Sequence, residues 1–308
     1  MHNKDVRDAF FDEVYELASK DKNVIFISAD ADAFSLRRYK KELPDQFINV
    51  GVAEQNMVLL ATGLALSGKK VFIYSITPFI TMRCFEQLKV NVCSMKLNVS
   101  IVGVGCGFSF SYDGPTHHAT QDIAIMRTLP EVAILNPCDE QTAQQAATIC
   151  YEQNSPTFVR IDKGTYNKLY NKKECNDGLK EISNKSKIKI ISSGYMTHKS
   201  LEITKDLREF GLMVDVVDLY RLKPLNESAL IDIIKKSDLI FTVEENTLIG
   251  GIGSMICEII ADNSLNVKLK RLALNDEQVL DFGDRDWLIE KSGLGKKKIL
   301  NIIRAKIK

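Results

Sequence analysis

Two groups of residues in this chain have types and positions that suit chemistry. Glu54 lies near the start of the stretch "NVGVAEQNMVLLATGLALSG", residues 49–68, which is otherwise almost wholly apolar. A carboxylate that leaves water is costly unless it is paired, hydrogen-bonded or protonated. We therefore expect Glu54 to contact a backbone amide, a neighbouring arginine or a bound ligand.

His117 and His118 form the second group. The chain has only 4 histidines, and these two are adjacent within "FSYDGPTHHATQ", residues 110–121. Turn chemistry explains the Asp-Gly-Pro part of this segment, but it does not explain a pair of histidines. The pair indicates a proton-handling or hydrogen-bonding site. No metal site is expected, because no third ligand lies at a suitable spacing.

The elements that must hold these residues alternate along the chain. Strand-length runs rich in Val and Ile, such as "NVIFISAD", "KKVFIYS", "NVSIVGVG", "EVAILNP" and "PTFVRID", are separated by helical patterns at 4–20, 53–67 and 138–152. This order predicts a doubly wound α/β domain over residues 1–167.

A second α/β unit follows a change in composition. Residues 168–187 lose periodicity and become polar, which predicts a linker between domains. Over 188–308 the pattern resumes, with strands at "KIKIISSG", "LMVDVVDL", "DLIFTVEE" and "VKLKRLAL". We predict helices between them at about 198–210, 226–236 and 251–261 and a last helix in the basic C-terminal segment.

Composition narrows the class of protein. The 308 residues are 45% hydrophobic and 26% charged, with a net charge of +1, which gives no electrostatic case for nucleic acid or a membrane surface. The 7 cysteines are scattered, so neither a disulfide framework nor a zinc site is indicated. Without a signal-like or membrane-spanning run, we expect a soluble, cytoplasmic protein.

Several segments, in the same order, resemble the transketolase family. The stretch around Glu54 is similar to the start of the pyrimidine-binding domain, and "DGPTHH" is similar to the family's "DGPTHQ" segment. In the second half, "RLKPLN" and "FTVEENTLIGGIGS" resemble the transketolase C-terminal domain. The resemblance runs from about Asp5 to the C-terminus and implies two α/β domains, the first a pyrimidine-binding domain.

The resemblance implies roles for residues around a thiamine diphosphate cofactor. Glu54 would hydrogen-bond the aminopyrimidine ring and promote catalysis, and Phe79 would stack on that ring. Arg83 lies in the same segment, "YSITPFITMRCFEQLK", and is a further cofactor-binding candidate. Taken alone, Phe79 fits a core phenylalanine after a strand equally well.

The substrate residues are implied in the same way. Asp113 and His117 match positions that contact sugar hydroxyls, with His117 also catalytic and His118 a possible second donor. Arg160 and Lys163, in "PTFVRIDKG", would hold a phosphate, although a surface ion pair explains them as well.

Two departures from the family pattern leave the phosphorylation of the substrate open. Phe34 stands near the place of a phosphate-contacting serine, with Ser35 beside it as the remaining candidate. Gly105 replaces a histidine that transketolases acting on sugar phosphates usually place before Asp113.

The family's diphosphate-binding pattern, "GDG" with an asparagine downstream, does not occur in this chain. The resemblance therefore implies the C-terminal (beta) subunit of a split transketolase. A separate alpha (N-terminal) subunit would hold the cofactor's diphosphate and Mg²⁺, in an α₂β₂ assembly that transfers a two-carbon unit from a ketose to an aldose.

Three alternatives stay open. One is an enzyme like 1-deoxyxylulose-5-phosphate synthase, and another is the beta subunit of a 2-oxoacid dehydrogenase. The third is a non-catalytic regulatory subunit that keeps the fold.

Overall fold

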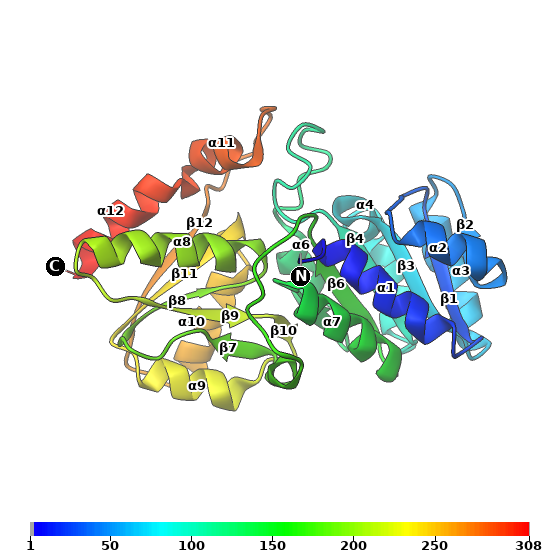
Figure 1. Cartoon of the computed structure of the whole chain (residues 1–308), viewed down its shortest axis with the longest axis horizontal. Coiled ribbons are helices and arrows are strands. Elements are labelled where there is room, and N and C mark those ends of the chain that lie inside the picture. The colour runs from blue at the N-terminus through cyan, green and yellow to red at the C-terminus, as the bar shows by residue number, and fades with distance from the viewer. Residues whose placement is uncertain (1–2, 308) are drawn as a thin grey trace.

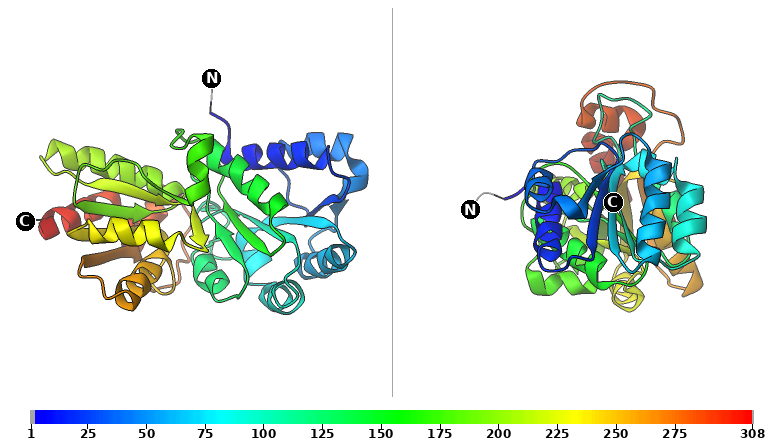
Figure 2. Two further views of the ribbon diagram at one scale, coloured as in Figure 1. Left: turned by 90° about the horizontal axis from the view of Figure 1, so that it is seen from below. Right: turned by 90° about the vertical axis from the view of Figure 1, so that its right-hand side faces the viewer.

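The computed structural model describes residues 3–307 and shows two α/β domains side by side (Figure 1). Each domain is built on one sheet with helices on both faces, which confirms the predicted fold class (Figure 2). Within residues 3–307, no helix is both long and apolar enough to cross a membrane.

The first domain contains a seven-stranded sheet in the order β10-β5-β6-β4-β3-β1-β2. All strands run parallel except β10, which pairs antiparallel with β5. The central strands are buried at nearly every position, as expected for a parallel sheet covered on both faces. The strands are β1 (Val24–Ser28), β2 (Phe47–Asn49), β3 (Lys70–Ile76), β4 (Val99–Val104), β5 (Ala133–Leu135), β6 (Thr157–Ile161) and β10 (Arg221–Lys223).

Helices cover the two faces of this sheet in separate layers. One layer consists of α1 (Val6–Ala18), α2 (Leu36–Glu42) and α7 (Glu140–Glu152). The other consists of α3 (Glu54–Leu66), α4 (Thr77–Thr81), α5 (Phe85–Gln87), η2 (Leu88–Cys93) and α6 (Asp122–Arg127). The short turn η1 (Pro44–Gln46) precedes β2. Side chains set the helix starts, since Asp5 caps α1 and Asp139 caps α7.

The second domain has a five-stranded sheet in the order β12-β11-β8-β9-β7, with only β7 antiparallel. Its helices α8 and α12 lie on one face and α9 and α10 on the other (Figure 1). The strands are β7 (Leu179–Glu181), β8 (Ile188–Ser192), β9 (Asp215–Leu219), β11 (Leu239–Thr247) and β12 (Lys268–Leu274). The helices are α8 (Tyr195–Glu209), α9 (Glu227–Lys235), α10 (Ile252–Asp262), α11 (Arg285–Ile289), η4 (Glu290–Leu294) and α12 (Lys296–Ile307).

The boundary between the domains is less simple than the sequence suggests. The stretch 168–187, expected to be a linker, contains the turn η3 (Lys172–Asp177) and the edge strand β7. In addition, β10 leaves the second half of the chain and joins the sheet of the first domain. Strands of three residues are too short to show a period of two, so the sequence pattern could not reveal them.

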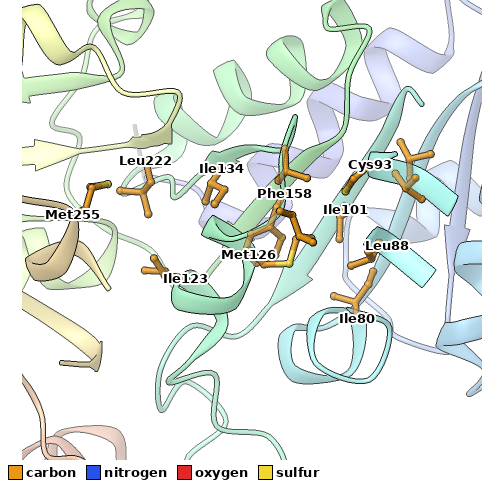
Figure 3. Close-up of a cluster of buried hydrophobic side chains, with 14 of the residues drawn as sticks. Ile80, Leu88, Cys93, Ile101, Ile123, Met126, Ile134, Phe158, Leu222 and Met255 are labelled. Atoms are coloured by element: carbon orange, nitrogen blue, oxygen red, sulfur yellow. The ribbon is translucent and has the colours of Figure 1, made fainter. Parts of the chain in front are cut away.

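A shared hydrophobic core holds the domains together. Ile101 and Phe158 of the first sheet belong to the same buried cluster as Leu222 and Met255 from the second half of the chain (Figure 3). The two domains therefore pack against each other through apolar contacts. This shared core fixes the positions from which the loops at the junction extend.

Shortening Ile101 should destabilise this core. Its side chain is fully buried in β4, between β3 and β6, so Ile101→Ala removes packed atoms and leaves a cavity. We expect a loss of about 2–5 kcal/mol in the free energy of unfolding, measured by urea denaturation. The matched control is Ile249→Ala, where the side chain is 63% exposed, and a change within about 0.5 kcal/mol is expected. Equal losses at both sites would contradict this account of the core.

Candidate active site

Most of the predicted site residues follow the carboxyl ends of parallel strands in the seven-stranded sheet. Carboxyl ends of parallel strands meet at one edge of a sheet, which is where α/β proteins bind ligands. In chain order, these are Ser35 after β1, Glu54 after β2, Phe79 and Arg83 after β3, Asp113 and His117 after β4, and Lys163 after β6.

Glu54 is the first residue of α3, and its side chain is 3% exposed. Its carboxylate accepts a hydrogen bond from Arg83 Nη1 at 2.7 Å and a longer one from Ser75 Oγ at 3.4 Å. The positive end of the helix dipole also favours a negative charge at this position. Within this chain, the partner of the buried carboxylate is therefore an arginine.

Arg83 connects Glu54 to an aromatic ring. Its guanidinium carbon lies 4.3 Å from the centre of the Phe79 ring while Nη1 is bonded to Glu54. The side chain of Arg83 is 45% exposed and can leave this position, whereas Glu54 and the half-buried Phe79 are held by the fold. A flat ring that donates a hydrogen bond would meet the same two partners. Glu54 and Phe79 thus fit the aminopyrimidine ring that the sequence resemblance implies.

His117 lies next to this pair, on the loop after β4. The edge of its ring contacts Phe79, with the ring centres 4.9 Å apart, and its other neighbour is Phe110, at 5.9 Å. Its Nδ1 is 3.0 Å from the hydroxyl of Thr116. His117 is half-buried beside these rings, and Asp113 of the same loop is exposed.

The first turn of α1 joins the segments that carry Ser35 and Lys163. The N–H of Val6 donates to the carbonyl oxygen of Gly164 at 3.0 Å. Asp8 Oδ1 accepts the N–H of Ser35 at 3.2 Å. Two loops that are far apart in the sequence, after β1 and after β6, are thereby fixed to one helix end.

Arg7 and Lys163 form a pair of cations there. Lys163 Nζ lies 3.6 Å from the centre of the Phe110 ring. Burial lowers the pKa of Lys163 below its usual value, and the positive charge of Arg7 lowers it further. Arg7 Nε is buried and has no hydrogen-bond partner among residues 3–307. The charges of Arg7 and Lys163 act on each other, and the carboxylates of Asp162, Asp113 and Asp5 balance part of this positive charge within the chain.

Arg7 was not predicted from the sequence, and its position in the first turn of α1 is only a weak signal. A positive charge in the first turn of a helix is unfavourable, because that end of the helix dipole is itself positive. The acids Asp5 and Asp8 of the same turn offset this charge, so the arginine does not by itself indicate an anion.

Arg160 does not lie in this group. Its guanidinium is 6% exposed, and Nε donates to Asp122 Oδ2 at 2.6 Å while Nη2 donates to the carbonyl oxygen of Ala119 at 3.2 Å. Burial is the largest single influence and would lower the pKa of Arg160, but the charge and hydrogen bond of Asp122 together with other acidic groups nearby outweigh it, so the pKa is raised. Asp122 also accepts a hydrogen bond from Asn246 Nδ2 of the second domain, at 2.9 Å. Arg160 thus contributes to domain packing and lies apart from Lys163, the other residue predicted to hold a phosphate.

His118 points away from His117. Its ring meets the edge of Phe108, with the ring centres 4.8 Å apart, and the side chain is 4% exposed. It lines a cavity of about 230 Å³ between the domains, together with Thr120 and Thr247. The two adjacent histidines therefore lie in different surroundings, and His118 lies apart from the other predicted substrate residues.

Comparison with known proteins places the chain in a family. The family model described as "Transketolase, pyrimidine binding domain" matches residues 2–168. The model described as "Transketolase, C-terminal domain" matches residues 178–299. The chain belongs to the transketolase family.

Relatives of similar length support this. A putative transketolase C-terminal section from Methanocaldococcus jannaschii is 33% identical over 311 residues, covering 99% of this chain and 97% of the relative. One subunit of the apulose-4-phosphate transketolase of Phocaeicola vulgatus is 32% identical over 301 residues, covering 95% and 94%. The solved structure of a split gene transketolase, an inactive beta4 tetramer, matches with a TM-score of 0.85 at 26% identity over 98% of each chain.

The predicted family and activity are confirmed: this is a thiamine diphosphate-dependent transketolase subunit of the C-terminal, or beta, type. These relatives also indicate a separate partner subunit. The 1-deoxy-D-xylulose-5-phosphate synthase of Nitrosomonas eutropha is 30% identical, but the matched region is only 48% of its length. The synthase alternative is thus a more distant match than the separate subunits.

The surroundings of His118 predict an unusual titration. Burial lowers its pKa, with smaller contributions from a hydrogen bond to the Ser111 backbone, which raises it, and from His117, which lowers it. We expect its imidazole signal in NMR to titrate below the ordinary histidine value of about 6.5. A midpoint at or above that value would contradict the buried position.

The same shift has a consequence for stability. The unfolded chain takes up a proton on His118 near the ordinary pKa, while the folded chain does so only at lower pH. Stability from this residue is therefore present above about pH 6.5 and is lost as the pH falls, by at most about 1.4 kcal/mol per pH unit. His118→Gln should make the free energy of unfolding less sensitive to pH in that range, as followed by urea denaturation at several pH values.

Proposed function

We propose that this chain supplies the aminopyrimidine-binding and sugar-binding half of a transketolase active site. The observation that carries the proposal is the contact of Glu54, Arg83 and Phe79, because Glu54 and Phe79 together suit a flat hydrogen-bond donor. A partner alpha subunit would hold the diphosphate and Mg²⁺ of the cofactor. Two copies of each subunit would form an α₂β₂ heterotetramer with two sites.

All seven cysteines, which lie within residues 3–307, are free thiols, in keeping with a cytoplasmic location.

Thiamine diphosphate, when bound, supplies the carbon nucleophile that carries the two-carbon unit. The role of Glu54 is to accept a hydrogen bond from the pyrimidine ring and so favour the tautomer that takes up a proton. Its burial strengthens this contact, because few waters compete for the carboxylate. Phe79 provides the stacking face. Arg83 must release Glu54, which its exposed side chain has room to do, and the ring would take over its hydrogen bond and its contact with Phe79.

His117 and Asp113 would contact the sugar. His117 lies against Phe79, so a substrate carbon near the cofactor ring would have its oxygens within reach of this imidazole. His117 would hold a proton at the substrate oxygen where charge develops, and Asp113 would accept a hydrogen bond from a hydroxyl.

Arg7, Lys163 and Ser35 would hold the far end of the substrate. Two cations and a hydroxyl suit a phosphate or a similar anionic group. The name of the Phocaeicola vulgatus relative includes a sugar phosphate, which agrees with an anion at this place. We therefore propose a phosphorylated or otherwise anionic sugar as the substrate class.

An enzyme like 1-deoxyxylulose-5-phosphate synthase, or the beta subunit of a 2-oxoacid dehydrogenase, would use a 2-oxoacid such as pyruvate in place of a ketose donor. Assays of the enzyme reconstituted with its partner, with pyruvate and with ketose phosphates, separate these alternatives. Turnover of pyruvate without turnover of any ketose would overturn the transketolase assignment.

Removing the carboxylate of Glu54 tests the proposed site. Glu54→Gln keeps the size of the side chain but weakens its hydrogen bond to the ring, and turnover of the reconstituted enzyme should fall by about 100-fold or more. The matched control is Glu209→Gln, at the exposed end of α8, which should leave turnover unchanged. Near-normal turnover of the Glu54 variant would sink the assignment.

Removing the charge of Lys163 tests the anion site. Lys163→Ala should raise the KM for phosphorylated sugars about 10- to 100-fold, the value of a hydrogen bond to a charged group. The KM for the corresponding sugars without phosphate should change little. Lys168→Ala, at an exposed lysine nearby, is the control. A parallel rise for both kinds of sugar would show that Lys163 does not recognise the anion.

A further inference from the structure

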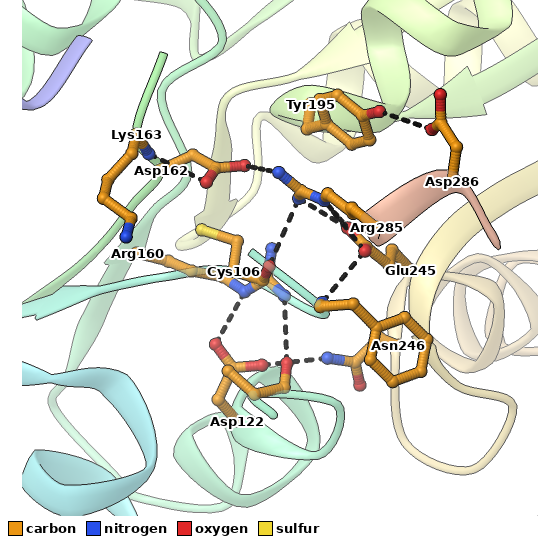
Figure 4. Close-up of polar contacts among 12 residues, drawn as sticks. Cys106, Asp122, Arg160, Asp162, Lys163, Tyr195, Glu245, Asn246, Arg285 and Asp286 are labelled. Carbon is orange, nitrogen blue, oxygen red and sulfur yellow. Dashed lines mark hydrogen bonds and ion pairs between the residues drawn. The ribbon is translucent and has the colours of Figure 1, made fainter. Parts of the chain in front are cut away.

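Arg285, the first residue of α11, reaches from the second domain into the first (Figure 4). Its Nε donates to Glu245 Oε1 at 3.0 Å, and Nη2 pairs with Glu245 Oε2 at 2.6 Å. Nη1 forms an ion pair with Asp162 Oδ2 at 2.7 Å. Nη2 also donates to the carbonyl oxygen of Cys106 at 3.2 Å. One guanidinium thus contacts three separate segments of the chain.

These contacts involve two buried carboxylates that need a cation. The side chains of Asp162 and Glu245 are 3% and 2% exposed, and that of Arg285 is 15% exposed. Burial alone would lower the pKa of Arg285, but the two carboxylates raise it well above its usual value. The guanidinium also lies over the ring of Tyr195, 3.7 Å from its centre. A planar fork with several donors suits this position in a way that an ammonium group does not.

Each carboxylate holds a backbone group on its other side. Glu245 Oε1 accepts the N–H of Phe108 at 2.9 Å. Asp162 Oδ1 accepts the N–H of Lys163 at 2.8 Å. Phe108 lies near the start of the loop that carries the proposed sugar-binding residues, and Lys163 belongs to the proposed anion site. The contacts of Arg285 therefore lead directly to both parts of the substrate region.

The tip of the sugar-binding loop meets the same part of the second domain. A side-chain carbon placed on Gly114 would lie 2.6 Å from Cε1 of Phe282, so the ring packs directly against the glycine. Figure 1 shows the two loops projecting together on one side of the molecule. The segment just before α11 thus supports the loop at its tip, and Arg285 holds it at its base.

We propose that Arg285 is a positioning residue for the sugar substrate. It would keep the loop of Asp113 and His117 and the backbone at Lys163 in register, without touching the substrate itself. The inference rests on the proposed roles of those three residues. With this role for Arg285, the C-terminal domain would contribute to substrate binding in addition to any contact between subunits.

A second arginine provides a matched control. Arg127 of α6, with a side chain 17% exposed, also joins the domains. Its Nη1 donates to the carbonyl oxygen of Gly250 at 2.7 Å, and it pairs with Glu258. These contacts lie on α10 and the turn before it, apart from the loop after β4. We therefore expect loss of Arg127 to weaken the domain junction without affecting the substrate region.

The experiment compares Arg285→Lys with Arg127→Lys in the enzyme reconstituted with its partner. Arg285→Lys keeps the charge but cannot make all the contacts, so we expect the KM for the sugar substrates to rise about tenfold with kcat lowered less than about threefold. Affinity for thiamine diphosphate should stay unchanged. Arg127→Lys should leave both kinetic constants within about twofold.

Hydrogen exchange on this chain gives a readout that does not depend on activity. The amide of Phe108 should exchange about tenfold faster in Arg285→Lys than in the wild-type protein, and at the wild-type rate in Arg127→Lys. If Arg285→Lys does not fold, Glu245→Gln replaces it, since this variant keeps an acceptor for Phe108 but loses the ion pair. Its KM should rise in the same direction.

The outcomes separate this inference from the proposed function. Equal effects of the two arginine variants on KM and on exchange would overturn the positioning role and leave only domain stability. Full activity of His117→Ala would instead overturn the proposed sugar site, whatever the arginine variants show. Unchanged exchange at Phe108 together with an inactive His117→Ala enzyme would overturn the inference alone.

Discussion

A charge taken out of water must be paired, and three groups of ion pairs, each with a buried carboxylate, organise the substrate region and its supports. Glu54 pairs with Arg83 where the cofactor ring is proposed to bind. Arg160 pairs with Asp122 below the loop after β4. Arg285 pairs with Asp162 and Glu245 across the domain junction. In the last two groups the arginine is also largely buried, whereas in the first the arginine, Arg83, is 45% exposed. This difference in exposure distinguishes the pairs that support the fold from the pair that lies in the candidate site.

The sequence predicted most of the architecture because its signals are local. Runs such as "NVSIVGVG" are long and apolar enough to identify buried strands, and the edge where their carboxyl ends meet follows from parallel pairing. Placement of Glu54, Phe79 and His117 at that edge was therefore within reach of sequence reasoning. β10 was not, because its three residues pair with a strand almost ninety positions earlier, and nothing in their own pattern shows this.

Two predicted site residues, His118 and Arg160, lie apart from the others because their side chains point in different directions. His117 and His118 are neighbours, yet on non-helical backbone successive side chains leave on different sides, and one meets Phe79 while the other meets Phe108. Arg160 lies within β6, so its side chain enters a layer covered by a helix and needs a buried acid. Lys163, just beyond the strand, is free of that constraint.

Arg83 shows how one half of an active site can stay stable without the other. Left alone, a carboxylate that is 3% exposed and an aromatic face beside it would be costly and prone to collapse. The guanidinium meets both needs, since it is planar, charged and a donor, and it lies on Phe79 while bonding Glu54. A flat heterocycle with an N–H donor makes the same two contacts, so exchange of one for the other keeps a hydrogen bond and a stacking contact but loses the opposite charge of Arg83. On the proposed function, the net change then also depends on the affinity of the remaining part of the ligand for the partner subunit that would hold it. Cofactor binding and subunit association would consequently strengthen each other, since neither half holds the whole ligand alone.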